Sequence, residues 1–418
     1  MTKPKYGRVL SAVLERITPD PSVKRKCEKV LSEIKAEIRK ARILGDAVLG
    51  GSIAKGTFLR DDYDCDIFVR FEIGRYKDKD ISSILGKALS KFSPQKVKGS
   101  RDYYQFERDW IHFEIVPVLK IRKPGEAVNV IDVSPMHSAW IRKRLSAKKG
   151  LSDEVRLARA FCKGIGVYGA ESFISGFSGH VIDIMTIYYG GFIKLLSASQ
   201  KWDKKVVIDP ENHQKGRALF NLNTSKTAGP LVLVDPVQPD RNAAASLSPG
   251  NMKIFRKEAK KFLKSPSESF FREKALDIGA APGKIVVEAF SIPGNKDVSG
   301  CKVKKAFEFI REKLEENEFP VKRSAWQWDQ EKKAHFVYFI YKNSLNDATM
   351  RKGIIRRGPP VSLKEHAAAF RRKYRKVFGE EGFLWAEVPR KYTSPEKLLA
   401  ALSKEAYLKD KIKGFKIL

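Results

Sequence analysis

The stretch that most constrains the fold is Gly50-Gly51-Ser52-Ile53-Ala54-Lys55, followed twelve residues after Ser52 by Asp64-Cys65-Asp66-Ile67-Phe68-Val69. Side chains alternate between the two faces of a strand, so Asp64 and Asp66 lie on one face about 7 Å apart while Cys65 faces the other way. The apolar residues that follow are typical of a strand buried in a sheet. The surrounding runs predict a mixed sheet with helices packed on it.

Two carboxylates on one sheet face can hold divalent cations through oxygen ligands, as a two-metal phosphoryl-transfer site requires. A third acid should come from a neighbouring strand. Glu114 suits this role, because a charge flanked by Phe113 and Ile115 is otherwise unfavourable in an apolar strand. Asp109 and Glu107 are the alternatives. An isolated Asp-x-Asp motif is usually just a solvated strand end. Only its combination with the glycine turn and a third acid on a later strand indicates a catalytic site.

The glycine turn has features of a phosphate-binding loop. Gly51 permits a close backbone approach, and Ser52 at the start of a helix presents amide donors and a hydroxyl group to phosphate. Lys55, one turn further on, adds positive charge. A P-loop is excluded, because Thr57-Phe58 stands where that motif needs Lys followed by Ser or Thr.

The net charge narrows the class of partner. The chain has 418 residues, with 81 Lys and Arg against 49 Asp and Glu, a net charge of +32. This surplus favours a nucleic-acid partner, and 42% hydrophobic residues argue against disorder. No apolar run approaches the roughly 18 residues of a membrane span, so we expect a soluble, cytoplasmic protein with no membrane partner. The four cysteines form no CxxC pair and are expected to be reduced thiols.

Hydrophobic periodicity divides the chain into successive α and β regions. The first helices are predicted over 5–17 and 22–42, and residues 137–200 return to helical spacing. A further helix is expected over 248–264, and strands and helices alternate beyond it. The runs that predict strands are 47–52, 65–71, 103–119, 127–134, 205–209, 230–235, 274–279, 284–290, 321–328, 334–341 and 383–388, and those that predict later helices are 302–316, 362–377 and 395–404.

Five blocks in order resemble the archaeal-type (class I) CCA-adding enzymes, which are tRNA nucleotidyltransferases. Besides GGSIAKGTFLRDDYDCDIF, they are SPMHSAWI at 134–141, KGIGVYGAESFISGFSGH at 163–180, DPVQPDRNAAASLS at 235–248 and GPPVSLKEHAAAFRRKY at 358–374. The resemblance covers nearly the whole chain. It implies a multidomain α+β protein, with a polymerase-β-like nucleotidyltransferase head on a mixed sheet, a helical neck, and an α+β body and tail. The corresponding boundaries are 1–136, 137–204, 205–300 and 301–418.

The activity that the resemblance implies is template-independent addition or repair of the 3′-terminal CCA of tRNA from CTP and ATP. Asp64, Asp66 and Glu114 would hold two Mg²⁺ ions and act as the catalytic carboxylates. The family usually has Asp at the third position, where this chain has Glu114. The residue after Glu171 is usually an aromatic that touches nucleotide; here it is Ser172, and that contact is not carried over.

The resemblance also implies which residues bind the nucleotide. Arg241 corresponds to the family's base-reading arginine, whose planar fork of donors can meet cytosine or adenine in a way that a lysine cannot. From residue type alone, His137 is more often a structural histidine at the start of a helix, and Lys163 is more often a solvated lysine on a helix face. The complete set of nucleotide-binding residues is Gly51, Ser52, Lys55, His137, Lys163 and Arg241.

The basic tail would grip the tRNA along its acceptor and T arms. A-form RNA is recognised through its backbone and shape. A homodimer is compatible with the sequence, which does not set the oligomeric state. The residues expected to contact RNA are Arg356, Arg357, Arg371, Arg372 and Lys373, together with Arg351 and Lys352.

Three other interpretations remain open from the sequence. Another polymerase-β-like enzyme, such as a poly(A) polymerase, would share the chemistry of the head. A non-catalytic RNA-binding protein on the same fold would have no reason to keep two like charges on one strand face. The turn Asp277-Ile278-Gly279-Ala280-Ala281-Pro282-Gly283 looks like the cofactor-binding turn of RNA methyltransferases, a weak signal by itself.

Overall fold

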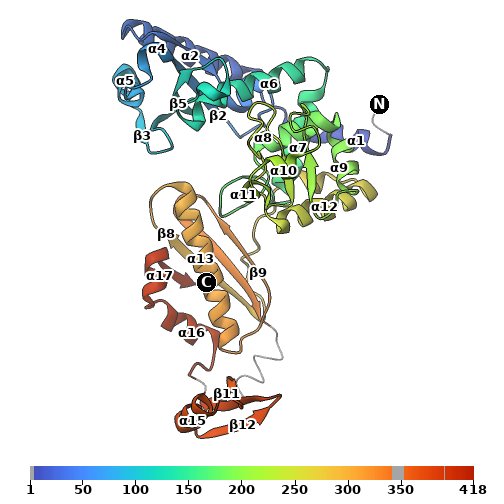
Figure 1. The fold of residues 1–418 in the computed structure, drawn as a ribbon, viewed down its shortest axis with the longest axis vertical. Helices are drawn as coiled ribbons and strands as arrows, with labels where there is room; N and C mark the ends of the chain where they lie inside the picture. The colour runs from blue at the N-terminus through green and yellow to red at the C-terminus, as the bar shows by residue number, and fades with distance from the viewer. Residues whose placement is uncertain (1–3, 341–352, 390) are drawn as a thin grey trace. The chain divides into compact units, whose positions relative to one another are not determined.

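The computed structural model describes residues 4–340, 353–389 and 391–418, and the chain divides into two compact units, Met1–Lys274 and Ala275–Leu418 (Figure 1). Each unit is described by itself. The finer division into four domains stays a prediction. Arg351 and Lys352 lie outside the described residues.

The two N-terminal helices form where periodicity predicts them, as α1 (Pro4–Ile17) and α2 (Pro21–Lys40). The cap of α2 is Asp20, whose carboxylate accepts a hydrogen bond from the Ser22 backbone N–H at 2.6 Å. The buried stripe of α2 includes Val23, Val30 and Ile34, which share a core with the first sheet. The helix therefore covers one face of that sheet and leaves the other for the site.

The first sheet is mixed, as the resemblance implies. Its strand order is β1-β2-β5-β4-β3; β2 and β5 run parallel and the other neighbours antiparallel. The run 103–119 is two strands joined by a tight turn at Asp109 and Trp110, both with positive φ. The strands are β1 (Gly45–Leu49), β2 (Asp64–Glu72), β3 (Gln95–Val97), β4 (Tyr103–Arg108) and β5 (Ile111–Lys120), with short helices α3 (Gly51–Lys55), α4 (Ile73–Tyr76), α5 (Ile81–Ala88) and η1 (Ser90–Phe92).

The predicted strand over 127–134 is wrong. The segment instead follows the 3-10 turn η2 (Pro124–Glu126), forms a second 3-10 turn, η3 (Val130–Val133), and ends at the first residue of a helix, Ser134. Asp132 is buried, and its carboxylate accepts hydrogen bonds from the backbone N–H groups of Leu119 and Asn129. A buried carboxylate needs several donors, so the chain wraps around it although the apolar alternation imitates a strand.

The helical region of the first unit packs around a cluster of aromatic rings. Phe161 lies with its ring centroid 5.5 Å from that of Phe192 and 6.0 Å from that of Phe255. The helices are α6 (Ser134–Ser146), α7 (Leu151–Gly164), α8 (Gly179–Tyr189), α9 (Phe192–Ser199), α10 (Ala218–Asn221), α11 (Thr224–Thr227), α12 (Pro249–Lys264) and η4 (Glu268–Phe271), with a small parallel pair, β6 (Val206–Ile208) and β7 (Leu231–Leu233).

No single helix among the described residues has the length and apolar composition to cross a membrane. The helices α8 and α9 meet those criteria only as a pair bent by 92°.

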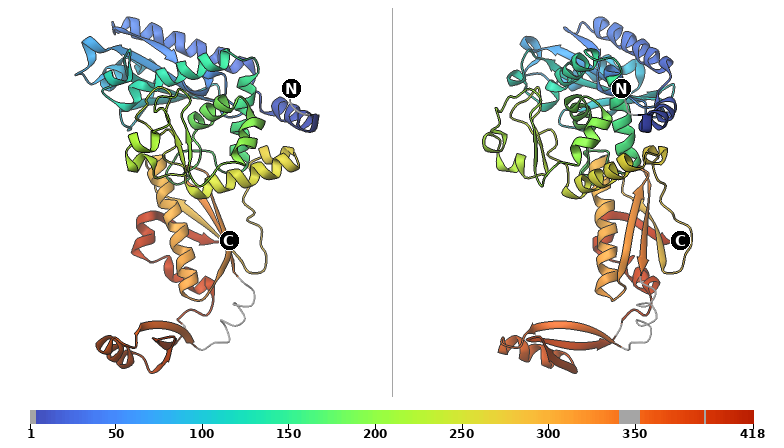
Figure 2. Two further views of the ribbon diagram at one scale, coloured as in Figure 1. Left: turned by 45° about the vertical axis from the view of Figure 1, so that its right-hand side comes forward. Right: turned by 90° about the vertical axis from the view of Figure 1, so that its right-hand side faces the viewer.

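The second unit has two antiparallel sheets. The first has the order β14-β8-β10-β9, and α13 (Lys296–Glu316) packs on it (Figure 2). The second has the order β11-β13-β12, with α15 (Lys364–Lys373) against β11. The remaining elements are β8 (Lys284–Ser291), β9 (Val321–Trp328), β10 (Lys333–Ile340), β11 (Gly353–Pro360), β12 (Lys376–Glu380), β13 (Phe383–Pro389), α16 (Pro395–Leu402), α17 (Ala406–Lys411) and β14 (Ile412–Ile417).

The predicted strand over 274–279 is also wrong. This segment is irregular, and the turn that follows leads into β8, which is antiparallel to both of its neighbours. The Asp277 carboxylate accepts a hydrogen bond from the Gly279 N–H and pairs with Lys284. A glycine-rich cofactor turn connects a strand to a helix in a parallel sheet, so this turn does not have the surroundings that methyl transfer would need.

Candidate active site

The strand register places two of the predicted catalytic acids side by side. Asp66 on β2 is directly opposite Glu114 on β5, and Asp64 is opposite His112. The Glu114 Oε1 atom accepts a hydrogen bond from Gln105 Nε2 at 2.7 Å. Asp109 lies in the turn beyond β4, and Glu107 on β4 is opposite His112, so of the three candidates for a third acid Glu114 is the one directly opposite Asp66.

This arrangement disfavours the ionised form of the Asp66 carboxylate. Burial, followed by the charge of Glu114, raises the pKa of Asp66 to about 7. The Lys55 ammonium acts in the opposite direction but does not cancel these effects. Two adjacent carboxylates, with Asp64 beside them and only oxygen donors, match the ligand preference of Mg²⁺, and a divalent cation would relieve their repulsion. The residues present therefore fit a magnesium site.

The glycine turn lies directly against the Asp66 carboxylate. Gly51 has φ +54°, and a Cβ atom added to it would be 1.6 Å from Asp66 Oδ2. The backbone N–H of Gly50 donates to the Asp66 carbonyl oxygen at 2.8 Å. No residue with a side chain fits at position 51 without moving the carboxylate, which explains the glycine physically.

Lys55 is held by charged groups that the sequence did not single out. Its Nζ atom donates to Asp183 Oδ2 at 2.7 Å, and the Arg159 guanidinium donates to both oxygens of the same carboxylate. Burial alone raises the pKa of Asp183, but the charges of Arg159 and Lys55 outweigh it and hold that pKa below its usual value. Two cations around one buried acid leave one positive charge in excess beside Asp66. The available signals were Asp183, a carboxylate in the otherwise largely apolar helix α8, and Arg159 within the run LARAFC of the amphipathic helix α7.

One pocket of about 550 Å³ collects most of the predicted nucleotide-binding residues. Gly51, Lys55, Asp66, His137 and Arg241 all line it, although they come from separate segments of the first unit. Its volume is within the range of ligand sites. Ser52 is adjacent to Gly51 on α3 but is not part of the lining. The remaining lining residues are Phe68, Val130, Ile131, Ser134, Ser138, His180 and Gln238.

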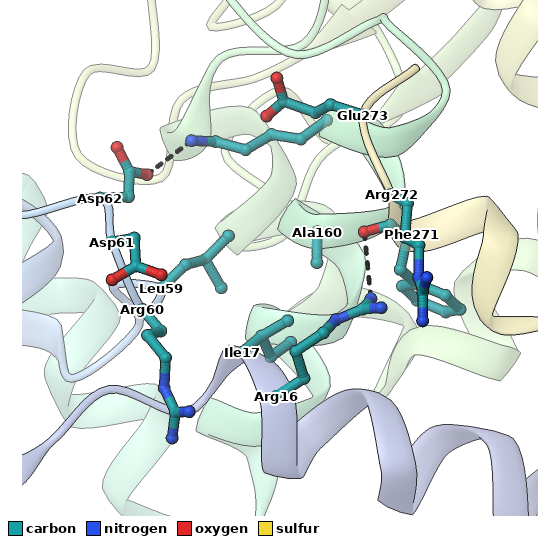
Figure 3. A pocket seen from close by; sticks show the side chains of 11 residues that line it. Arg16, Ile17, Leu59, Arg60, Asp61, Asp62, Ala160, Phe271, Arg272 and Glu273 are labelled. Carbon is teal, nitrogen blue, oxygen red and sulfur yellow. Dashed lines mark hydrogen bonds and ion pairs between the residues drawn. The ribbon is translucent and has the colours of Figure 1, made fainter. Parts of the chain in front are cut away.

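Lys163 lies elsewhere. It lines a second pocket, of about 610 Å³, and its Nζ atom donates to Asp62 Oδ2 at 2.7 Å. Figure 3 shows this pocket, where Asp62 and Arg60 approach from the loop before β2 and Arg16 comes from the end of α1. The structure therefore does not bring Lys163 into the pocket that Lys55 and Arg241 share. Ser172 is exposed, and the neighbouring aromatic residue, Phe173, is buried.

The predicted RNA-binding residues that the structure describes lie on the second sheet of the second unit and on the helix that packs against it. Arg356 and Arg357 lie on β11, and the Arg357 guanidinium is 3.7 Å from the ring centroid of Phe383. Arg371, Arg372 and Lys373 form the last turn of α15 and are exposed. The side chains of Arg357, Arg371, Arg372 and Lys373 are exposed and so accessible to a large anionic partner.

Three family models match the chain. They are a nucleotidyltransferase domain over residues 28–131, the second domain of tRNA nucleotidyltransferase over 153–272, and the C-terminal domain of CCA-adding enzyme over 290–413.

Among curated relatives, the CCA-adding enzyme of Pyrobaculum aerophilum is 31% identical over 88% of this chain and 85% of its own length. The CCA-adding enzyme of Archaeoglobus fulgidus is 27% identical over 94% of this chain and 88% of its own. That of Nanoarchaeum equitans is 40% identical, over 57% of this chain and 61% of its own length.

Among solved structures, the Cid1 poly(U) polymerase bound to MgATP superposes with a TM-score of 0.51 at 13% identity, over 64% of this chain and 98% of that one. This likeness shows the polymerase-β-like fold alone.

Proposed function

Because the chain belongs to the family of CCA-adding tRNA nucleotidyltransferases, we propose that it adds or restores the 3′-terminal CCA of tRNA from CTP and ATP without a nucleic-acid template. The observation that carries this proposal is the pocket in which the Asp66 carboxylate, the Lys55 ammonium and the Arg241 guanidinium face one space. An acid for cation binding, a cation for phosphate and a planar donor for a base are what nucleotidyl transfer requires together.

We propose Asp64, Asp66 and Glu114 as the ligands of two Mg²⁺ ions, which when bound would lower the pKa of the tRNA 3′ hydroxyl and neutralise the triphosphate. The protein's contribution is to fix these acids before substrate arrives. The β2–β5 register sets Asp66 against Glu114, and the absence of a side chain at Gly51 leaves the space that the Asp66 carboxylate occupies.

Lys55 and the backbone of Gly51 and Ser52 are proposed to hold the triphosphate. Lys55 is held in place because Asp183 accepts its hydrogen bond, so it loses little conformational freedom when a phosphate binds. We also propose that Lys163 contacts the nucleotide. A phosphate oxygen would then replace the Asp62 carboxylate as the acceptor of its hydrogen bond. His137 and Arg241 are proposed to contact the rest of the nucleotide.

The tail is proposed to bind the acceptor and T arms of tRNA. The exposed cations of α15, together with Arg356 and Arg357 on β11, can pair with backbone phosphates of an A-form duplex. Recognition of backbone and shape allows one protein to serve tRNAs of different sequence. Because its proposed substrate is tRNA, we propose that the enzyme is cytoplasmic. Whether it forms a homodimer stays a prediction, which light scattering of the purified protein would test.

The test uses three tRNA transcripts, ending at the discriminator base, at C and at CC, with Mg²⁺ and labelled CTP or ATP. The expected products are C, C and then A, with addition stopping there. Long A tails would replace the proposal with a poly(A) polymerase. Absence of incorporation on all three transcripts, with tRNA still bound, would contradict catalysis and favour an RNA-binding protein.

A further inference from the structure

Asp235 is a buried carboxylate on which several polar groups of the nucleotide pocket converge. Its side chain has 0% exposure, and it lies two residues beyond the end of β7. The Arg241 Nη1 atom donates to its Oδ2 at 2.8 Å. His180 Nε2 lies 3.4 Å from the same oxygen, and His137 Nε2 lies 3.1 Å from Oδ1. The backbone N–H groups of Val237 and Gln238 also donate to Oδ1.

The charge states around Asp235 follow from these contacts. Burial disfavours its charge, but hydrogen bonds from His137 and His180 hold the pKa of Asp235 well below its usual value. Burial lowers the pKa of His180, which is therefore neutral near pH 7. A neutral imidazole that donates through Nε2 has its acceptor at Nδ1. Asp235 thus fixes the tautomer of an imidazole as well as the direction of a guanidinium.

The same group must be weighed as a metal site, because ligand atoms of His137, His180 and Asp235 lie within 4.8 Å of one another. Both Asp235 oxygens already accept hydrogen bonds, and one of the donors is the guanidinium of Arg241. A metal ion would bring a second positive charge next to Arg241. Charge complementarity therefore favours a hydrogen-bonded cluster, here called the Asp235 hub, in which Asp235 accepts from Arg241, His137 and His180 and Arg241 supplies the positive charge.

We propose that Asp235 is the positioning residue that holds Arg241, His137 and His180 in the nucleotide pocket and thereby sets the selection of CTP and ATP over UTP and GTP. This inference rests on the proposed function. The Arg241 side chain is 46% exposed, so without Asp235 it would be a flexible arm at the pocket wall. Held by one nitrogen, it presents its other donors in a fixed plane, and a fixed set of donors rejects bases that leave those donors unpaired.

The informative substitution is Asp235→Asn. Its remaining oxygen can still accept from the backbone of Val237 and Gln238, so the local turn is kept. Its NH₂ group would face Arg241, placing a donor against a donor. The matched control is Asp240→Asn, the same change on the same loop at a side chain that is 84% exposed.

The experiment measures kcat/KM for all four nucleoside triphosphates on tRNA ending at the discriminator base and at CC. For Asp235→Asn we expect the preference for CTP over UTP and for ATP over GTP to fall about tenfold or more, while Asp240→Asn keeps both. The double variant Asp235→Asn with Arg241→Lys should lose no more selectivity than the worse of the two single variants, because both substitutions remove the same interaction, the one between Asp235 and Arg241. Mn²⁺ affinity and melting temperature report whether the carboxylates and the fold are intact.

Unchanged selectivity in Asp235→Asn, or selectivity losses that multiply in the double variant, would overturn the inference. If Asp235→Asn does not fold, the selectivity of a His180→Gln variant decides in the same way. Stabilisation of the wild type by Zn²⁺ that is lost in Asp235→Asn would replace the hub by a metal site. Wild-type protein that adds no nucleotide would contradict the proposed function, whereas active wild type with an equally selective variant contradicts only the role of Asp235.

Discussion

The nucleotide pocket of the first unit and the cationic tail of the second use charge in different ways. In the pocket, Lys55 is fixed by Asp183 and Arg241 by Asp235, and both acids are fully buried. In the tail, Arg371, Arg372 and Lys373 are exposed at the end of a helix. A buried charge in a fixed position acts through geometry, whereas an exposed one acts through its number and long-range field. The two regions should therefore respond very differently to substitution.

The largest effect should come from Asp66→Asn, which keeps the shape of the side chain and removes its charge. We expect kcat to fall by about 10³-fold or more, equivalent to about 4 kcal/mol, because no other group supplies the lost ligand. Affinity for tRNA should stay within about twofold, since RNA binding is assigned to the tail. Single-turnover rates and filter binding measure the two. The control is Asp46→Asn on β1, and near-wild-type turnover of Asp66→Asn would refute the metal assignment.

Gly51→Ala tests whether the pocket depends on geometry alone. The added Cβ would lie 1.6 Å from Asp66 Oδ2, so the carboxylate must move, and we expect activity to fall by about 100-fold. Gly56→Ala is the matched control, because Gly56 also has positive φ but nothing lies within 4 Å of its added Cβ. Equal losses in the two variants would show that backbone strain, not the contact with Asp66, limits activity.

The pH dependence of cation binding sharpens the same contrast. Because the pKa of Asp66 is raised to about 7 in the metal-free protein, a divalent cation must displace a proton below that pH. Mn²⁺ affinity should be level above pH 7 and should fall by up to about tenfold per unit as the pH decreases from 7 to 5. Isothermal titration against Mn²⁺ measures this, and the effect should vanish in Asp66→Asn. A flat profile would mean that Asp66 does not bind the ion.

The smallest effect per residue is expected in the tail. Replacing Arg371, Arg372 and Lys373 together by Gln should weaken tRNA binding about five- to tenfold and reduce the salt dependence by about one unit of slope per lost phosphate contact. The control replaces Lys24, Lys26 and Lys29, exposed on α2, so that net charge changes equally. If both triple variants weaken binding alike, the tail contributes only to the overall field.

Features set by residues close together in the sequence could be predicted, whereas contacts between residues far apart in the sequence could not. The extents of α1, α2 and β2 follow from local periodicity and agree with the structure to within a few residues. The strand expected over 127–134 failed because Asp132 draws its donors from Leu119 and Asn129, which alternation does not reveal. His180 and Asp235 stood within quoted blocks, yet nothing local marks them as partners.

The sequence by itself determined that Asp64 and Asp66 share a strand face, that a glycine turn precedes them, and that the chain is related to tRNA nucleotidyltransferases. Only the tertiary structure decided that Glu114 faces Asp66, that Lys55 binds Asp183 across 128 residues, and that Lys163 pairs with Asp62 in a different pocket. The reason is physical: side-chain alternation is a property of adjacent residues, whereas the partner of a buried charge is set by how distant segments pack.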